Sequence, residues 1–208
     1  MKYKLVIFDF DGTLANTIPW FTSALNTVAV RYRFKPINQT DIERLRGLHA
    51  KDIMKYLGIP LWKAPLITAH LRTLLAKNLH QVSLFEDVDM LLEMLARKGI
   101  RLALISSNSE DNVRHILGPA NEALITDYEC GVSIFGKTAK LRKVLRSSGI
   151  AKHEAILIGD ELRDGESAQR VHIAFGAVTW GCNSRDSLTA SKPEVMFTRI
   201  GEILEYIL

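Results

Sequence analysis

Residues 5–14 read LVIFDFDGTL, an apolar run that ends at Asp9 and is followed by a second carboxylate, Asp11, and a glycine. A continuous apolar run of this length is typical of a strand buried on both faces of a parallel sheet. Two carboxylates at the point where a strand turns into a loop can converge on one site. Asp9 could accept a phosphoryl group, while Asp11 could protonate the leaving oxygen and then activate water. The alternative is an acidic loop that closes the strand and caps a helix.

Three more apolar runs break into polar residues and predict further strands, at Leu102–Ile105, Ala155–Ile158 and Ile173–Val178. Between them, apolar residues recur with helical spacing in two segments that end at glycines. These apolar residues are Val88, Leu91, Leu92 and Leu95 before Gly99, and Leu141, Val144 and Leu145 before Gly149. Alternating strands and helices indicate an α/β fold with a doubly wound, Rossmann-like parallel sheet. Ligands of such sheets bind beyond the carboxyl ends of the strands.

Residues 15–82 contain helical patterns and no convincing strand. Thr17 could cap a first helix that carries Pro19 in its first turn. Further helices are expected around Thr40–Arg46, Lys51–Leu57 and Trp62–Leu79. We therefore expect an all-helical cap at 15–82, inserted after the first strand of a core formed by residues 1–14 and 83–208.

A second acidic cluster, Asp160, Glu161 and Asp164, follows the predicted strand at Ala155–Ile158. Clustered carboxylates repel one another unless a cation lies among them, and Mg²⁺ prefers a few carboxylate oxygens with water and phosphate. Asp160 and Asp164 are spaced to serve as a ligand and a supporting group. The alternative is a helix N-terminus, where acidic residues are favoured by the helix dipole.

A polar stretch, Ser106-Ser107-Asn108, follows the predicted strand at Leu102–Ile105. Ser107 and Glu110 fit a helix capping box, in which Ser precedes Glu by three residues. This leaves Ser106 unexplained. Its hydroxyl group and the amides of Ser107 and Asn108 could hold a phosphoryl oxygen.

Lys137 precedes another predicted helix, where a single lysine is usually exposed to solvent. However, four aspartates and a phosphate dianion carry more charge than one Mg²⁺ balances. A fixed ammonium group would offset part of this excess and would keep the nucleophile ionised.

The order and spacing of these stretches resemble the four signature motifs of the haloacid dehalogenase-like hydrolases. The residues are Asp9-x-Asp11-Gly-Thr-Leu, Ser106, Lys137, and Gly-Asp160-x-x-x-Asp164. The likeness spans nearly the whole chain, and the first motif is highly specific. It implies a phosphatase of the phosphoglycolate phosphatase or beta-phosphoglucomutase-like branch, with a helical cap between the first two motifs. One departure is Glu86-Asp87, which stands where a Pro-Gly pair is common before the helix that follows the cap.

The resemblance also implies a role for each motif residue. Asp9 would be the nucleophile and a metal ligand, and Asp11 the general acid/base that offers its main-chain carbonyl to the metal. Ser106, with Ser107, Asn108 and Lys137, would bind the phosphoryl group. Asp160 would be a ligand of Mg²⁺, and Thr13 and Asp164 would support the site. Dehalogenases of the superfamily usually lack the second acid, so Asp11 favours phosphoryl transfer.

The segment around Gly47 resembles the cap loop that faces the active site in related enzymes, which makes Arg46, His49 and Lys51 candidate substrate ligands. Arg46 could pair with a substrate carboxylate or second phosphate. A solvated cation at a helix end is an equally good interpretation. Trp20 and Phe21 could line the substrate pocket, although aromatic residues of this kind more often belong to a core.

The composition is that of an ordinary globular chain of 208 residues, 47% hydrophobic and 24% charged, with a net charge of +4. There is no long basic run to indicate a nucleic-acid partner. Cys130 and Cys182 lack metal-site spacing and are too few for a disulfide framework, which favours a reduced, cytoplasmic protein. No stretch approaches the ~20 apolar residues of a membrane helix. A monomer and a homodimer are both compatible with the sequence.

Three activities remain open on these residues. The first is Mg²⁺-dependent hydrolysis of a small phosphorylated metabolite through an aspartyl-phosphate on Asp9. The second is a sugar-phosphate phosphomutase, which would return the phosphoryl group to a sugar. The third is a phospho-accepting signalling module; against it, a receiver domain has no long helical insertion after its first strand, and Asp11 supplies an acid/base that a long-lived phosphoryl state would avoid.

Overall fold

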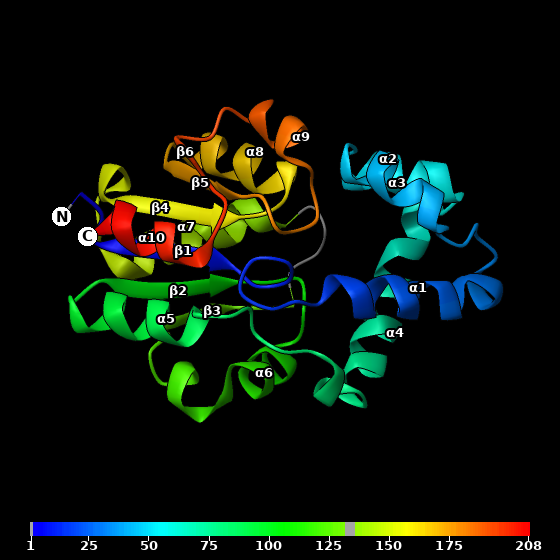
Figure 1. Cartoon of the computed structure of the whole chain (residues 1–208), viewed down its shortest axis with the longest axis horizontal. Coiled ribbons are helices and arrows are strands. Elements are labelled where there is room, and N and C mark those ends of the chain that lie inside the picture. The colour runs from blue at the N-terminus through cyan, green and yellow to red at the C-terminus, as the bar shows by residue number, and fades with distance from the viewer. Residues whose placement is uncertain (1, 132–135) are drawn as a thin grey trace.

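A six-stranded sheet forms the centre of the molecule, with the strand order β3-β2-β1-β4-β5-β6 and parallel pairing throughout the described strands (Figure 1). The computed structural model describes residues 2–131 and 136–208. The strands are β1 Leu5–Asp9, β2 Arg101–Ile105, β3 Asp127–Glu129, β4 Ala155–Gly159, β5 Ala174–Val178 and β6 Val195–Phe197. The predicted α/β class with a doubly wound parallel sheet is confirmed.

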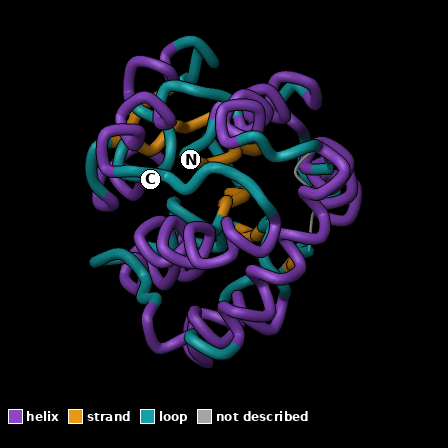
Figure 2. The backbone as a smooth tube through the Cα atoms, turned by 90° about the vertical axis from the view of Figure 1, so that its right-hand side faces the viewer, coloured by secondary structure: helices purple, strands orange, loops and turns teal. Residues whose placement is uncertain are grey.

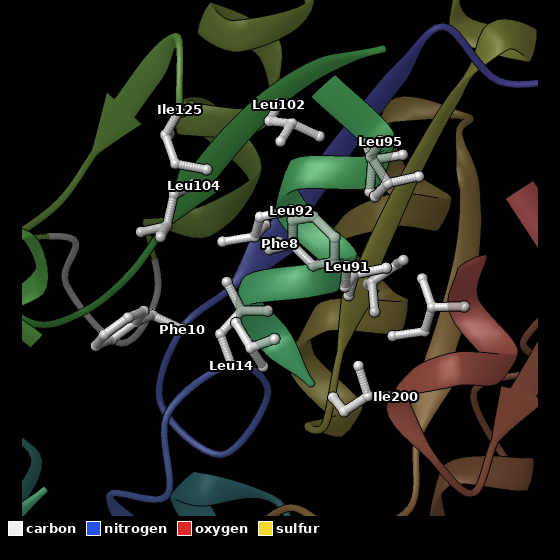
Figure 3. Close-up of a cluster of buried hydrophobic side chains, with 14 of the residues drawn as sticks. Phe8, Phe10, Leu14, Leu91, Leu92, Leu95, Leu102, Leu104, Ile125 and Ile200 are labelled. Carbon is white, nitrogen blue, oxygen red and sulfur yellow. The ribbon is translucent and has the colours of Figure 1, made fainter. Parts of the chain in front are cut away.

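Helices cover both faces of this sheet, so that the strands lie within a shell of helices (Figure 2). On one face are α5 Val88–Arg97, α6 Glu110–Glu122 and α10 Ile200–Ile207. On the other are α7 Lys137–Ser148, α8 Leu162–Val171 and α9 Arg185–Thr189. Side chains of β1 alternate between the two layers: Val6 and Phe8 pack on the first, Leu5 and Ile7 on the second. Figure 3 shows Phe8 against Leu91, Leu92 and Leu95 of α5.

The register of β1 determines which side chains meet at the carboxyl edge. Asp9 pairs with Ile105 of β2, and Phe8 pairs with Ile158 of β4. The stretch that begins at Ser106 therefore lies on one side of Asp9, and residues 159–160 lie on the other side. Three polar stretches that are far apart in sequence meet at one edge because β1 lies between β2 and β4.

Helices α1 Ile18–Tyr32, α2 Ile42–Arg46, α3 Ala50–Leu57 and α4 Ala64–Ala76 lie beyond the carboxyl ends of the strands (Figure 1). Of these, α1, α3 and α4 share an apolar cluster that includes Leu25, Leu57 and Ile67. Two short segments join them to the sheet and run side by side. Asn16 N donates to Ser83 O at 2.9 Å, and Phe85 N donates to Leu14 O at 2.9 Å.

Two strands of the structure, β3 and β6, were not predicted. Each spans three residues and lies at an edge of the sheet, and β3 reads DYE. The apolar-run criterion misses such strands because an edge strand needs no long apolar run to be paired. None of the helices in residues 2–131 and 136–208 has the length and apolar character needed to span a bilayer.

The predicted Ser107–Glu110 capping box is wrong. Helix α6 begins at Glu110 with Ser109 as its N-cap, and Ser109 Oγ accepts from Asn112 N at 3.4 Å. Thr17 occupies the N-cap position of α1 as expected, but its side chain makes no capping hydrogen bond. The Glu86-Asp87 turn adopts the left-handed conformation at Asp87, with φ of 66°. Asp is one of the few non-glycine residues that adopt this region readily, so the turn forms without the usual glycine.

We expect Leu92→Ala to lower the free energy of unfolding by about 2–5 kcal/mol, because a fully buried leucine leaves a cavity when truncated. Urea unfolding followed by circular dichroism measures the change. Met90→Ala, on the exposed side of the same helix, is the matched control and should shift stability by at most about 0.5 kcal/mol. Equal effects of the two substitutions would contradict the packing of α5 on the sheet.

Candidate active site

The loop after β1 brings the first acidic pair against the second acidic cluster. Asp9 ends the central strand and is 2% exposed, and its Oδ1 accepts from Phe10 N at 2.9 Å. Gly12 has φ of +81°, and a Cβ at this position would lie 2.3 Å from Asp160 Oδ2. Thr13 Oγ1 donates to Asp160 Oδ1 at 2.8 Å. Only glycine at position 12 permits the loop after β1 to approach Asp160 this closely. The buried hydrogen bond from Thr13 then holds the loop against the Asp160 carboxyl group.

Three buried carboxylates converge at this edge of the sheet. One oxygen from each of Asp9, Asp160 and Asp164 lies within 4.8 Å of the others. Asp160 Oδ2 accepts from Cys182 N at 2.7 Å. Burial, followed by the negative charge of Asp9, raises the pKa of Asp160 well above its ordinary value. In the absence of a further cation, this environment favours the protonated form of Asp160.

Glu161 and Asp164 also form the capping box of α8, in which Asp164 Oδ2 accepts from Glu161 N at 3.1 Å. The helix-terminus interpretation of this cluster is therefore correct for these two residues. It does not account for Asp160, which precedes the helix and is fully buried.

Lys137 is the first residue of α7 and is 3% exposed, so the interpretation as a solvated lysine is wrong. Its Nζ lies 2.9 Å from Asp9 Oδ2 and 2.5 Å from Asp164 Oδ1. Burial alone would lower the pKa of Lys137, but the charges of Asp164 and Asp9 outweigh burial and raise it. The ammonium group is therefore held charged between two carboxylates, as the sequence predicted.

The third polar stretch binds the second acid. Ser106 Oγ donates to Asp11 Oδ2 at 2.9 Å, and Asn108 Nδ2 lies 3.5 Å from Asp11 Oδ1. Ser106 Oγ also accepts from Asn108 N at 2.9 Å. Burial of the carboxyl group, followed by the charge of Asp9, raises the pKa of Asp11 to about 6. A carboxyl group with this pKa can both donate and accept a proton near neutral pH.

A cavity of about 510 Å³ lies between the helical segment and the strand ends. Asp11, Ser107 and Asn108 line it from the sheet, and Trp20 and Phe21 line it from α1. Of the two interpretations of these aromatic residues, lining a pocket is the one that the structure supports. The acid/base candidate therefore faces the cavity, while the three clustered carboxylates lie next to it.

Of the three cap candidates, Arg46 is the one among the described residues that reaches this cavity. Its guanidinium group donates to Cys182 O and Gly181 O, each at 3.3 Å. His49 Nδ1 instead lies 3.5 Å from Glu166 Oε1 on α8, and Lys51 is exposed. Arg46 thus contacts the core loop directly, whereas the other two lie away from the cavity.

Two residues with clear contacts at the site were missed by the sequence analysis. Trp180 Nε1 donates to Thr13 O at 3.2 Å, and its ring packs edge-on against Phe85. Arg163 lines the cavity and pairs with Glu161, at 2.5 Å between Nε and Oε2. The Thr-Trp-Gly stretch after the fourth predicted strand was a signal for Trp180, but no spacing rule indicated Arg163.

The acidic residues fit a hard divalent cation. Asp9 Oδ2 is buried, and Lys137 Nζ lies 2.9 Å from it. One ammonium group does not balance three clustered carboxylates, so the cluster is costly unless a further cation or a ligand compensates it. Carboxylate oxygens are the ligands that Mg²⁺ prefers, and Asp9 and Asp160 are close enough to share an ion.

Comparison with known proteins identifies the family of this chain. The family model described as haloacid dehalogenase-like hydrolase matches residues 6–178. A phosphoglycolate phosphatase of Synechococcus elongatus is 30% identical over 98% of this chain and 97% of its own length. One from Rhodospirillum rubrum is 28% identical over 86% of this chain and 80% of its own length.

A crystal structure from Lactobacillus plantarum, provisionally assigned as a phosphoglycolate phosphatase, has the same fold. It is 24% identical, with a TM-score of 0.83 over 99% of each chain. The chain therefore belongs to the haloacid dehalogenase-like hydrolase family, as a phosphatase of its phosphoglycolate phosphatase-like branch.

Proposed function

We propose that this chain hydrolyses a small phosphate monoester with the help of Mg²⁺ and that Asp9 carries the phosphoryl group between two half-reactions. The observation that supports this most strongly is the convergence of Asp9, Asp160 and Asp164. Lys137 is paired with Asp9 and Asp164, and Asp11 lies on the cavity side. Phosphoglycolate phosphatases among the relatives make 2-phosphoglycolate the first substrate to assay.

In the first half-reaction, a carboxylate oxygen of Asp9 attacks the phosphorus atom as the ester P–O bond breaks. Asp11 donates its proton to the departing oxygen, so that an alcohol leaves. In the second half-reaction, Asp11 takes a proton from water, which attacks the phosphorus of the aspartyl-phosphate. Inorganic phosphate is released, Asp9 is regenerated, and Asp11 is again protonated.

The remaining residues hold charge and position. Ser106 Oγ and the amides of Ser107 and Asn108 would bind phosphoryl oxygens, and Lys137 would offset the charge that Asp9 and the phosphoryl group bring together. Asp9, Asp160 and the main-chain carbonyl of Asp11 would hold Mg²⁺, with Thr13 and Asp164 in support. When bound, Mg²⁺ supplies neutralisation of the charge on the transferring phosphoryl group.

Residues 15–82 would act as a cap over this site, with the paired segments at 14–16 and 83–85 as its two linkers. A cap that covers the site excludes bulk water while the ester is cleaved. The two free cysteines, Cys130 and Cys182, suit a reducing cytoplasm. A phosphomutase would use the same first half-reaction but would return the phosphoryl group to a sugar.

We expect Asp9→Asn to lower phosphate release from 2-phosphoglycolate and from p-nitrophenyl phosphate by about a thousandfold or more, because an amide is a far poorer nucleophile. Asp186→Asn, the same change at an exposed carboxylate on α9, should keep full activity. Circular dichroism checks that both variants fold. More than about a tenth of the original activity in folded Asp9→Asn would refute the nucleophile assignment.

Removal of divalent cations with EDTA should abolish turnover, and added Mg²⁺ should restore it, since the acidic cluster needs a compensating cation. Isothermal titration of the metal-free protein measures Mg²⁺ binding directly. Asp160→Asn should weaken this binding by about tenfold or more because one carboxylate ligand is lost. Full turnover in EDTA would show that no cation is required.

We expect Arg46→Ala to raise KM for 2-phosphoglycolate by about tenfold. The guanidinium group of Arg46 lines the cavity, where hydrogen bonds to the Gly181 and Cys182 carbonyls hold it. Arg44→Ala on the same helix is the matched control, since Arg44 is exposed and does not line the cavity. Steady-state kinetics over a panel of phosphate esters measures both. An unchanged KM across the panel would remove Arg46 from the substrate site.

A further inference from the structure

The cavity extends well beyond the reacting groups, into the space between the helices of the cap. Its wall there consists of side chains from α1, α3, α4 and the adjoining turn. They are Ile18, Phe21, Leu25, Ile53, Met54, Leu57, Ile59, Ile67, Leu71 and Leu75. Several of them also form the apolar cluster of the cap, so the cavity reaches into the core of this helical unit.

The whole cavity, with its core side included, has a volume of about 510 Å³, which is too large to be a packing defect. Protein interiors are packed about as densely as organic crystals, and voids larger than a water molecule are few. Cavities of roughly 300–1,000 Å³ with mostly apolar walls are typical of sites that bind small molecules. The wall is closely packed at Leu57 and Ile67, which are 1% and 4% exposed, and it opens to solvent at Phe21, which is 47% exposed.

The charged side chains that line the cavity lie on or near its core side: Asp11, Glu161 and Arg163 from the core, with Arg46 and Arg72 from the cap. Arg72 is close enough to Asp11 for the two charges to interact. No carboxylate from the cap lines the cavity among the described residues. Of the hydroxyl groups there, Thr22 Oγ1 already donates to Ile18 O at 2.9 Å. A polar leaving group placed against this wall would lose water and gain few hydrogen bonds.

The proposed chemistry directs one part of the substrate toward this wall. Asp9, Ser106 and Lys137 would hold the phosphoryl group at the sheet edge, and Asp11 would protonate the leaving oxygen from the cavity side. The carbon skeleton attached to that oxygen would then lie between α1, α3 and α4. This step depends on the proposed function, since it uses the assigned roles of Asp9 and Asp11.

We propose that the preferred substrates are phosphate monoesters of apolar alcohols, whose alkyl or aryl group fills the hollow of the cap. Such esters would be cleaved with a higher kcat/KM than 2-phosphoglycolate or the phosphates of small polar acids and sugars. The apolar group would gain free energy from burial, while its phosphate end meets the same residues as any other substrate of the enzyme.

The test is a series of straight-chain alkyl phosphates from methyl to octyl, assayed with the whole chain and Mg²⁺. We expect kcat/KM to rise by about threefold per added methylene until the cavity is filled, because each buried methylene contributes a similar increment. n-Hexyl phosphate should then exceed 2-phosphoglycolate. A flat or falling series, with 2-phosphoglycolate hydrolysed well, would overturn the inference.

A pair of variants on one helix locates the effect. Thr68 lines the cavity from α4, and its neighbour Ala69 is exposed. Thr68→Phe should lower the ratio of kcat/KM for n-hexyl to methyl phosphate by about tenfold, since it occupies the space for about two methylenes. Ala69→Phe should leave the ratio unchanged, and an unchanged ratio in folded Thr68→Phe would contradict the inference. If Thr68→Phe does not fold, the smaller Thr68→Leu replaces it.

Binding without turnover separates this inference from the proposed function. n-Hexylphosphonate and methylphosphonate cannot be hydrolysed, and calorimetry measures their affinities directly. Tighter binding of the hexyl compound by tenfold or more supports an apolar site even if no ester is cleaved. Equal affinities, in an enzyme that does cleave p-nitrophenyl phosphate, would leave the phosphatase assignment intact and refute the apolar site.

Discussion

The rest of the structure depends on the buried ion pairs of one ammonium group, Lys137, with two carboxylates at the edge of the sheet. Its Nζ contacts both Asp9 and Asp164, and all three side chains are buried. A third carboxyl group, Asp160, lies in the same cluster, where burial and the charge of Asp9 raise its pKa. Charges are removed from water at high cost unless they are closely paired. The chain therefore has to bring these groups within ångströms of one another, and the fold supplies that closeness.

Parallel topology is what makes such convergence possible. With β1 between β2 and β4, the segments that follow all three strands emerge at the same edge. A fourth segment, after β5, approaches Asp160 so closely that a Cβ at Gly181 would lie 2.2 Å from the Asp160 Cβ. The backbone amide of Cys182 can then donate to the Asp160 carboxylate. The site is thus assembled by strand order first and adjusted by a glycine second.

The sequence predicted what depends on long apolar runs and clustered charge. The central strands, the helical segment and the convergence of Asp9 with Asp160 follow from patterns that extend over several residues. Edge strands β3 and β6 could not be predicted because three residues carry too little pattern. Helix α6 begins at Glu110, later in the sequence than the predicted capping box implied. Ser106 and Asn108 donate hydrogen bonds to Asp11, and Ser109 is the residue that caps the helix. The cavity is lined by residues of α1, α3 and α4 together with loops of the core, and no local sequence pattern encodes such an arrangement.

The loop of residues 181–184 contacts both the acidic cluster at the sheet edge and the end of α2, so these two parts of the site are not independent of each other. Asn183 Nδ2 donates to Arg46 O at 2.9 Å and to Leu48 O at 3.1 Å, while its Oδ1 accepts from Leu162 N at 3.0 Å. The main-chain amide of Cys182, the residue before Asn183, donates to Asp160 Oδ2. A shift of α2 relative to the sheet would therefore break hydrogen bonds of the loop that also orients Asp160. Since buried hydrogen-bonding groups are costly to leave unpaired, the position of α2 and the geometry of the acidic cluster are coupled through residues 181–184.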